Sequence, residues 1–299
     1  MVRVRAADPS PEADLVAGLT ALPFVVIAVT AAGPAGPGWP ALADVVVPEG
    51  DASLTAIVDT VVAHPVASTT LALLLRGQDR RSIADGLVAE SSAYSVLQSG
   101  PEFAAWRATR PVRTPGTDGP RVRLERLGSC LRVTLTRPDR RNALDAQMRD
   151  ELMEGLSVAV ADPSVARLEL RGEGPAFSAG GDLDEFGRRA DPSTAHLVRL
   201  QRSPAGMLAL LSARTTVYLH GAAVGSGIEL AAFARTVVAE PDTTIALPEV
   251  ALGLIPGAGG TVSLPRRIGR WRTAWLALSG RTIDVTTAVE WGLVDRIGD

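Results

Sequence analysis

The chain has 299 residues, which is enough for one large domain or two small ones. Hydrophobic residues make up 46% of it and aromatic residues only 4%, so the core must consist mainly of Ala, Val and Leu. The net charge of −3 gives no reason to expect nucleic acid or an anionic membrane surface as a partner. The single cysteine, Cys130, excludes an internal disulfide and favours a reducing compartment, so we expect a cytoplasmic protein. The three histidines, His64, His196 and His220, lack ligand spacing, so we predict no metal site.

The N-terminal part contains an uncharged run from Leu15 to Ala43, which raises the question of a membrane span. Several prolines and glycines interrupt the run and would break a continuous helix. We therefore expect a short helix, a buried strand at residues 23–29 and a turn-rich loop, and no membrane span. Acidic residues and two prolines precede the run, which does not fit a secretory signal.

The stretch from about Arg107 to Arg121 has three prolines, two glycines and no hydrophobic period, so it is typical of a linker. It divides the chain into a mostly helical region at 1–115 and a second region at 116–299. From about Arg121 onward the pattern alternates between strands and helices, which predicts the α/β class. The expected elements are a hairpin at 122–136, helices at 145–161, 227–235 and 269–280 (the last ending at Gly280), and strands at 166–172, 215–221, 235–240 and 243–248.

Two glutamates, Glu229 and Glu249, lie in glycine-framed segments of the second region. Glycines let the backbone approach a ligand closely, and a helix N-terminus presents free N–H groups. Glu229 comes three residues after Ser226, so both belong to the first turn of one expected helix. Glu249 follows Pro248, which restricts the residue before it to extended geometry.

Three segments carry a resemblance to a known family: FSAGGDLDEF at 177–186, HGAAVGSGIELAA at 220–232 and ALPEVALGLIPGAGG at 246–260. In this order and with these gaps, they resemble the crotonase (enoyl-CoA hydratase/isomerase) superfamily from about Val122 to the last residue. The resemblance implies a crotonase/ClpP-like spiral of repeated ββα units. It also implies a homo-oligomer, either a trimer or a dimer of trimers.

The resemblance assigns a role to four residues. The backbone N–H groups of Gly181 and Ser226 would form an oxyanion hole, although family members usually have glycine at the second position. Glu229 and Glu249 would be an acid/base pair around one water, in which their pKa values are pushed apart. The alternative for each glutamate is a solvated surface charge.

The segment from Arg137 to Asp145 resembles the loop that lines the CoA adenine and phosphate pocket. Arg140 and Arg141 suit phosphate oxygens. Alternatively the segment is a plain turn in which Asn142 caps the following helix. By resemblance, the substrate-binding residues are Arg141, Ala143, Ala179, Gly180, Asp182, Leu183 and Gly225. For Asp182 we favour ordering of the loop over a chemical role.

The N-terminal region resembles the helices that family members carry after the segment corresponding to GLVD at 292–295. Residues 43–76 resemble the strand, turn and two helices that follow that segment in the family, and residues 87–111 resemble the family's last helices with their glutamate. We therefore expect a circular rearrangement in which these elements come first. The alternatives are an unrelated small helical domain or a degenerate second copy of the fold.

The activity that the resemblance implies is syn hydration of a 2-enoyl-CoA, or the reverse dehydration. The resemblance implies no metal or redox cofactor for this activity, and CoA is part of the substrate. The same fold also serves double-bond isomerases and thioester hydrolases. A non-catalytic, crotonase-like partner subunit is an alternative of another class.

Overall fold

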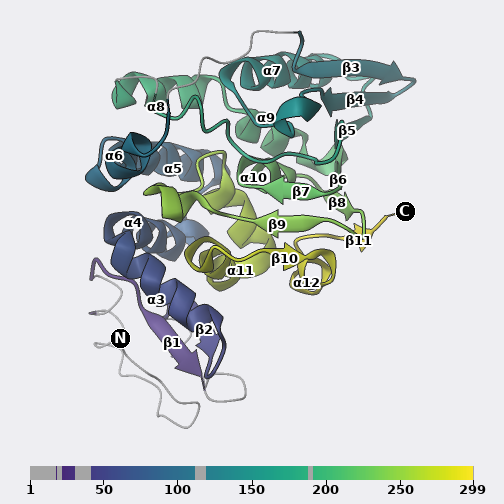
Figure 1. The fold of residues 1–299 in the computed structure, drawn as a ribbon. Helices are drawn as coiled ribbons and strands as arrows, with labels where there is room; N and C mark the ends of the chain where they lie inside the picture. The colour runs from purple at the N-terminus through teal and green to yellow at the C-terminus, as the bar shows by residue number, and fades with distance from the viewer. Residues whose placement is uncertain (1–17, 19–21, 31–41, 112–118, 188–190, 299) are drawn as a thin grey trace.

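The computed structural model describes residues 18, 22–30, 42–111, 119–187 and 191–298 (Figure 1). Its largest sheet consists of Val122–Leu127 (β3), Cys130–Leu135 (β4), Arg167–Gly172 (β5), Thr215–Leu219 (β6), Thr236–Ala239 (β8) and Arg296–Ile297 (β11). The strand order is β11-β8-β6-β5-β4-β3. β3 and β4 form the expected antiparallel hairpin, and the other neighbours in the sheet are parallel.

A row of buried apolar residues crosses the middle of this sheet. Val133 on β4 pairs with Leu170 on β5, and Leu170 pairs with Val217 on β6. Val217 in turn pairs with Val237 on β8, and all four side chains are buried. Branched apolar residues suit parallel strands that are covered on both faces. This row therefore fixes the register of the strands that lead to the site.

A second, smaller sheet lies beside the first, with the order β10-β9-β7. Its strands are Ala222–Val224 (β7), Thr244–Ala246 (β9) and Ile283–Asp284 (β10). β6 of the large sheet leads into β7 of the small one, and β8 leads into β9. A helical segment follows each pair: α10 (Ser226–Ala231) after β7 and the 3₁₀ turn η4 (Glu249–Leu252) after β9. The expected ββα rhythm is thus present, and it places Glu229 and Glu249 just after equivalent strands.

The remaining helices of this region cover the sheets. They are α7 (Ala146–Ala161), α8 (Pro192–Gln201), α9 (Pro204–Leu211), α11 (Gly260–Ser279) and α12 (Val285–Trp291), with 3₁₀ turns η2 (Pro138–Arg140) and η3 (Ser212–Arg214). The helix expected at 227–235 is shorter, because the chain must turn after Ala231 to enter β8. The helix expected at 269–280 begins earlier, at Gly260, and bends at Gly269. It ends as predicted at Gly280, which has a φ of 61°.

The N-terminal part packs directly on this frame. It contains β1 (Ile27–Thr30), β2 (Val45–Pro48), α3 (Ser53–Ala63), α4 (Pro65–Arg76), the 3₁₀ turn η1 (Gln78–Arg80), α5 (Ile83–Gln98) and α6 (Pro101–Ala108). α11 packs against α3, α4 and α5, while α5 also packs against α8 (Figure 1). Buried residues from both parts of the chain belong to one hydrophobic cluster. The expected boundary at 115/116 falls outside the described residues and stays a prediction.

Among the described helices, no single one is long and apolar enough to cross a membrane. The pair α3 and α4 passes that test of length and composition only when both helices are taken together, and they are bent by 110° relative to each other.

Candidate active site

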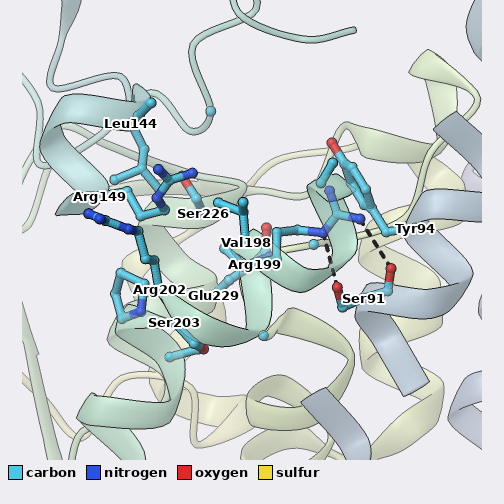
Figure 2. Close-up of a pocket in the computed structure, with 18 of the residues that line it drawn as sticks. Ser91, Tyr94, Leu144, Arg149, Val198, Arg199, Arg202, Ser203, Ser226 and Glu229 are labelled. Atoms are coloured by element: carbon cyan, nitrogen blue, oxygen red, sulfur yellow. Dashed lines mark hydrogen bonds between the residues drawn. The ribbon is translucent and has the colours of Figure 1, made fainter. Parts of the chain in front are cut away.

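A cavity of about 260 Å³ lies where α5, α8, α10 and the start of α11 approach one another. Glu229 and Glu249 both line it, as do Gly181 and Ser226. Figure 2 shows Glu229 and Ser226 between two groups of pocket residues, one around Arg149 and Arg202 and the other around Arg199 and Tyr94. The structure thus brings together all four residues to which the sequence assigned the chemistry.

Glu229 is a buried carboxyl group, with only 2% of the residue exposed. The backbone N–H groups of Ala258 and Gly260 donate to its Oε2 at 2.7 and 2.9 Å. In the described part of the chain, no donor reaches Oε1. Burial and the nearby carboxylates Glu249 and Glu90 raise the pKa of Glu229 well above its ordinary value, while the two amides oppose that shift. The alternative of a solvated surface charge is therefore wrong.

Glu249 is also buried, but its carboxyl group is less well satisfied. No described residue forms a hydrogen bond with its Oε2, although that atom is inaccessible to solvent. Burial raises the pKa of Glu249 to about 7, and the charge of Glu90 adds to the shift. Buried polar atoms usually have a hydrogen-bond partner, so this oxygen is available to a group that binds in the cavity.

Two backbone N–H groups in the cavity are available to a ligand. Among the described residues, neither Gly181 nor Ser226 donates its N–H in a hydrogen bond. Both residues line the same cavity as the two carboxyl groups. The Ser226 hydroxyl is buried and has no partner in the described structure. Unpaired amides in a cavity are suited to stabilise negative charge that develops on a bound oxygen atom.

Close packing between the glycine segments holds these amides in place. Ser178 forms a bridge to Ala223 on β7, and a Cβ on Gly227 would lie 2.9 Å from the Ser178 Cβ. A Cβ on Gly180, whose φ is 94°, would lie 3.1 Å from the Val224 carbonyl oxygen. The glycines thus allow the segment at 178–182 to lie directly against β7 and the start of α10.

A third buried carboxyl group, Glu90, was not assigned from the sequence. It comes from α5 and lines the same cavity. Its Oε1 accepts from the Gly259 N–H at 2.7 Å, and its Oε2 accepts from the Thr261 N–H and hydroxyl at 2.8 and 2.7 Å. Burial raises the pKa of Glu90 to about 7. The one signal in the sequence was the match of residues 87–111 to helices that carry a glutamate.

Arg199 and Tyr94 form a cationic and aromatic wall beside these carboxyl groups. The Arg199 guanidinium lies 4.8 Å from the centre of the Tyr94 ring and donates to the Ser91 hydroxyl and carbonyl oxygens at 3.1 and 3.2 Å (Figure 2). Burial lowers the pKa of Arg199 and raises that of the Tyr94 phenol. The Tyr94 ring also packs on Gly257, where a Cβ would lie 2.4 Å from it. Neither residue was identified from the sequence.

The other predicted site residues differ in whether they line the cavity. Asp182 lines the cavity, but its carboxylate pairs with the Arg137 guanidinium at 2.6 Å. Arg141 is exposed, with a φ of 49°, and its carbonyl oxygen accepts from the Ala179 N–H at 2.8 Å. The predicted substrate-binding residues that do not line the cavity are Arg141, Ala143, Ala179, Gly180, Leu183 and Gly225.

The expected helix cap at Asn142 is wrong. The Asn142 side chain instead accepts from the Arg137 N–H and donates to the Glu173 and Ala176 carbonyl oxygens. Its φ of 53° keeps it out of the helix that follows. Asp145 caps α7, since its Oδ1 accepts from the N–H three residues later at 2.7 Å.

Within the described residues, no cluster of His, Cys, Asp or Glu side chains is arranged to hold a metal ion.

Residues 125–298 match the family model described as enoyl-CoA hydratase/isomerase. The chain belongs to this family. It is 35% identical over 170 residues to the 2,3-dehydroadipyl-CoA hydratase of Escherichia coli, covering 56% of this chain and 65% of that protein. It is 34% identical over 174 residues to the enoyl-CoA isomerase/hydratase fer4 of Mycosarcoma maydis, covering 55% and 64% of the two chains.

Solved structures place the fold in the same family. The enoyl-CoA hydratase from Thermoplasma volcanium superposes with a TM-score of 0.55 at 32% identity, over 60% of this chain and 73% of that one. The described chain therefore has the crotonase fold. The match spans slightly less than two thirds of the length of the curated relatives, between 63% and 66%. About a third of each such relative thus has no counterpart in the match.

Proposed function

We propose that this protein is an acyl-CoA enzyme that adds water to the double bond of a 2-enoyl-CoA, or removes it in the reverse direction. One observation carries the proposal: two buried carboxyl groups and two unpaired backbone amides line a single cavity. Membership of the enoyl-CoA hydratase/isomerase family supports an acyl-CoA thioester as the substrate class.

The two amides would bind the thioester oxygen. As water adds to the β-carbon, electron density moves through the α-carbon onto that oxygen, and the N–H groups of Gly181 and Ser226 stabilise the resulting enolate. Because the donors are backbone N–H groups, a serine at position 226 still supplies its donor. CoA is carried by the substrate, and the reaction needs no other cofactor.

The hydrogen bonds divide the roles of the two carboxyl groups. Burial raises the pKa of Glu229, but the two N–H donors on Oε2 oppose that shift by stabilising the carboxylate, so we assign Glu229 as the base that takes a proton from water. Glu249 lacks a donor on Oε2, which suits a carboxyl group that carries the proton and delivers it to the α-carbon. Glu229 thus ends with a proton taken from water, Glu249 ends without the proton that it gave to the α-carbon, and exchange with solvent restores the pair. A shared water makes the addition syn.

Turnover of crotonyl-CoA tests this function. We expect the conjugated-thioester absorbance to fall, and the reaction in D₂O to give one diastereomer with deuterium and hydroxyl on the same face. Turnover of a 3-enoyl-CoA without hydration of crotonyl-CoA would contradict the proposal in favour of an isomerase. Binding of acyl-CoA without turnover of any such substrate would indicate a non-catalytic partner subunit.

A further inference from the structure

Four consecutive backbone amides at the start of α11 alternate between two carboxyl groups. The N–H groups of Ala258 and Gly260 point to Glu229, whereas those of Gly259 and Thr261 point to Glu90. The segment 258–261 is thus held from two sides, once by the catalytic glutamate on α10 and once by a glutamate on α5. Its free N–H groups are those that every helix N-terminus leaves without an internal partner.

Glu90 is as buried as the glutamates of the proposed acid/base pair. Only 2% of it is exposed, and the Thr261 hydroxyl adds a third hydrogen bond at 2.7 Å. No described basic side chain forms an ion pair with it. The charged and titratable groups that face it are Arg199 on α8, Tyr94 on α5 itself, Glu229 on α10 and Glu249 on η4.

We propose that Glu90 is a positioning residue for the acid/base pair. It holds segment 258–261 where its alternate amides reach Glu229, and it places a third negative charge beside both glutamates. The N-terminal part of the chain thereby sets the electrostatics of a site whose other chemical groups come from the second region. This inference rests on the roles proposed above for Glu229 and Glu249.

The charge of Glu90 has a predictable effect on pH dependence. Glu90 is ionised above a pKa of about 7, and its charge then raises the pKa values of Glu229 and Glu249. A carboxylic acid that must stay protonated for catalysis therefore keeps its proton to higher pH. Without the charge of Glu90 the pKa of that acid is lower, so the alkaline limb of the kcat profile moves to lower pH.

The test compares Glu90→Gln with Glu102→Gln. Glu102 is a matched control, because it also accepts from two backbone amides, those of Val66 and Ala67, at 2.7 and 3.1 Å, yet does not line the cavity. With crotonyl-CoA, E90Q should lose about tenfold or more in kcat, keep KM within about threefold, and show the acidic shift of the alkaline limb. E102Q should lose thermal stability but keep the wild-type kcat and profile. E90Q with a wild-type kcat and profile would overturn the proposal.

A titration separates this inference from the proposed function. Carbon-13 NMR of labelled glutamate carboxyl groups, assigned with Glu229→Gln and Glu249→Gln, needs no turnover. In E90Q we expect both resonances to titrate at lower pH than in the wild type. Unmoved titrations would overturn the inference even in an active enzyme. Moved titrations in a protein that turns over no enoyl-CoA would instead remove the proposed function alone.

A second variant serves if E90Q does not fold. Glu90→Asp keeps the charge but is one methylene too short to hold both amides. E90D should lower kcat and leave the pH of the alkaline limb in place. A wild-type kcat in E90D would contradict the positioning role.

Discussion

At the scale of single residues, the site depends on glycines that pack directly against carboxyl groups. A Cβ on Gly260 would lie 2.6 Å from the Glu229 Cγ, and one on Gly225 would lie 2.3 Å from the Glu249 Oε1. The two glutamates reach the cavity only because these backbone positions carry no side chain. The positions of these glycines in the sequence therefore indicate where the carboxyl groups lie as well as how the backbone turns.

Gly225→Ala tests this packing. Gly225 has φ 50° and ψ −123°, a region that side chains rarely adopt, so alanine adds backbone strain of about 1–3 kcal/mol, and its methyl group must also displace the Glu249 carboxyl group. We expect kcat for crotonyl-CoA to fall by about 100-fold, since a displacement near 1 Å has that effect on aligned groups. Steady-state kinetics and thermal melting measure the two effects.

The control is Gly128→Ala in the turn of the β3–β4 hairpin. Gly128 has a similar φ of 61°, but a Cβ there meets nothing within 4 Å. This variant should lose stability through backbone strain alone and keep the wild-type kcat. If both variants lose activity equally, backbone strain rather than carboxyl displacement explains the effect.

At the scale of elements, the sequence predicted those strands, turns and helix ends that depend only on residues close together in the chain. The β3–β4 hairpin, the strands on either side of each glycine segment and the end of α11 at Gly280 all follow from hydrophobic period and turn residues. The roles of Glu229 and Glu249 were predicted from the resemblance, and in the structure these residues lie in the helical segments that follow β7 and β9. Element lengths were less predictable, and α10 is shorter than expected because β8 begins so soon after it.

Contacts between distant segments account for what the sequence did not predict. Glu90 binds amides 169 and 171 residues further along the chain, and Arg199 binds Ser91 across 108 residues. No spacing rule links such positions, so the wall that α5 contributes was not predicted. Asn142 failed as a cap for a related reason, since its partners Glu173 and Ala176 lie beyond the helix it was expected to begin.

At the scale of the whole molecule, the N-terminal helices and the second region share one core. α11 contacts α3, α4 and α5, and the Trp275 indole N–H on α11 donates to the Ser53 hydroxyl on α3 at 2.9 Å. The proposed circular rearrangement accords with this packing but stays a prediction from the resemblance. The homo-oligomer and the cytoplasmic location likewise stay predictions.

A shared core predicts that the two parts unfold together. We expect one calorimetric transition whose van't Hoff and calorimetric enthalpies agree. Hydrogen exchange should give amides of α5 and α11 similar protection, because neither helix can open without exposing the other. Early loss of protection confined to residues 42–111 would show instead that the N-terminal part is an independent domain.

The central claim is that Glu229 and Glu249 act on one water in one cavity, and a double-mutant cycle tests it most directly. Glu229→Gln, Glu249→Gln and the double variant are compared in kcat for crotonyl-CoA, with acyl-CoA binding as the check on folding. Each single variant should lose about 10²–10⁴-fold. Because the two groups act as a unit, the double variant should be within about tenfold of the worse single variant. Losses that multiply independently, or a single variant with wild-type kcat, would contradict the account.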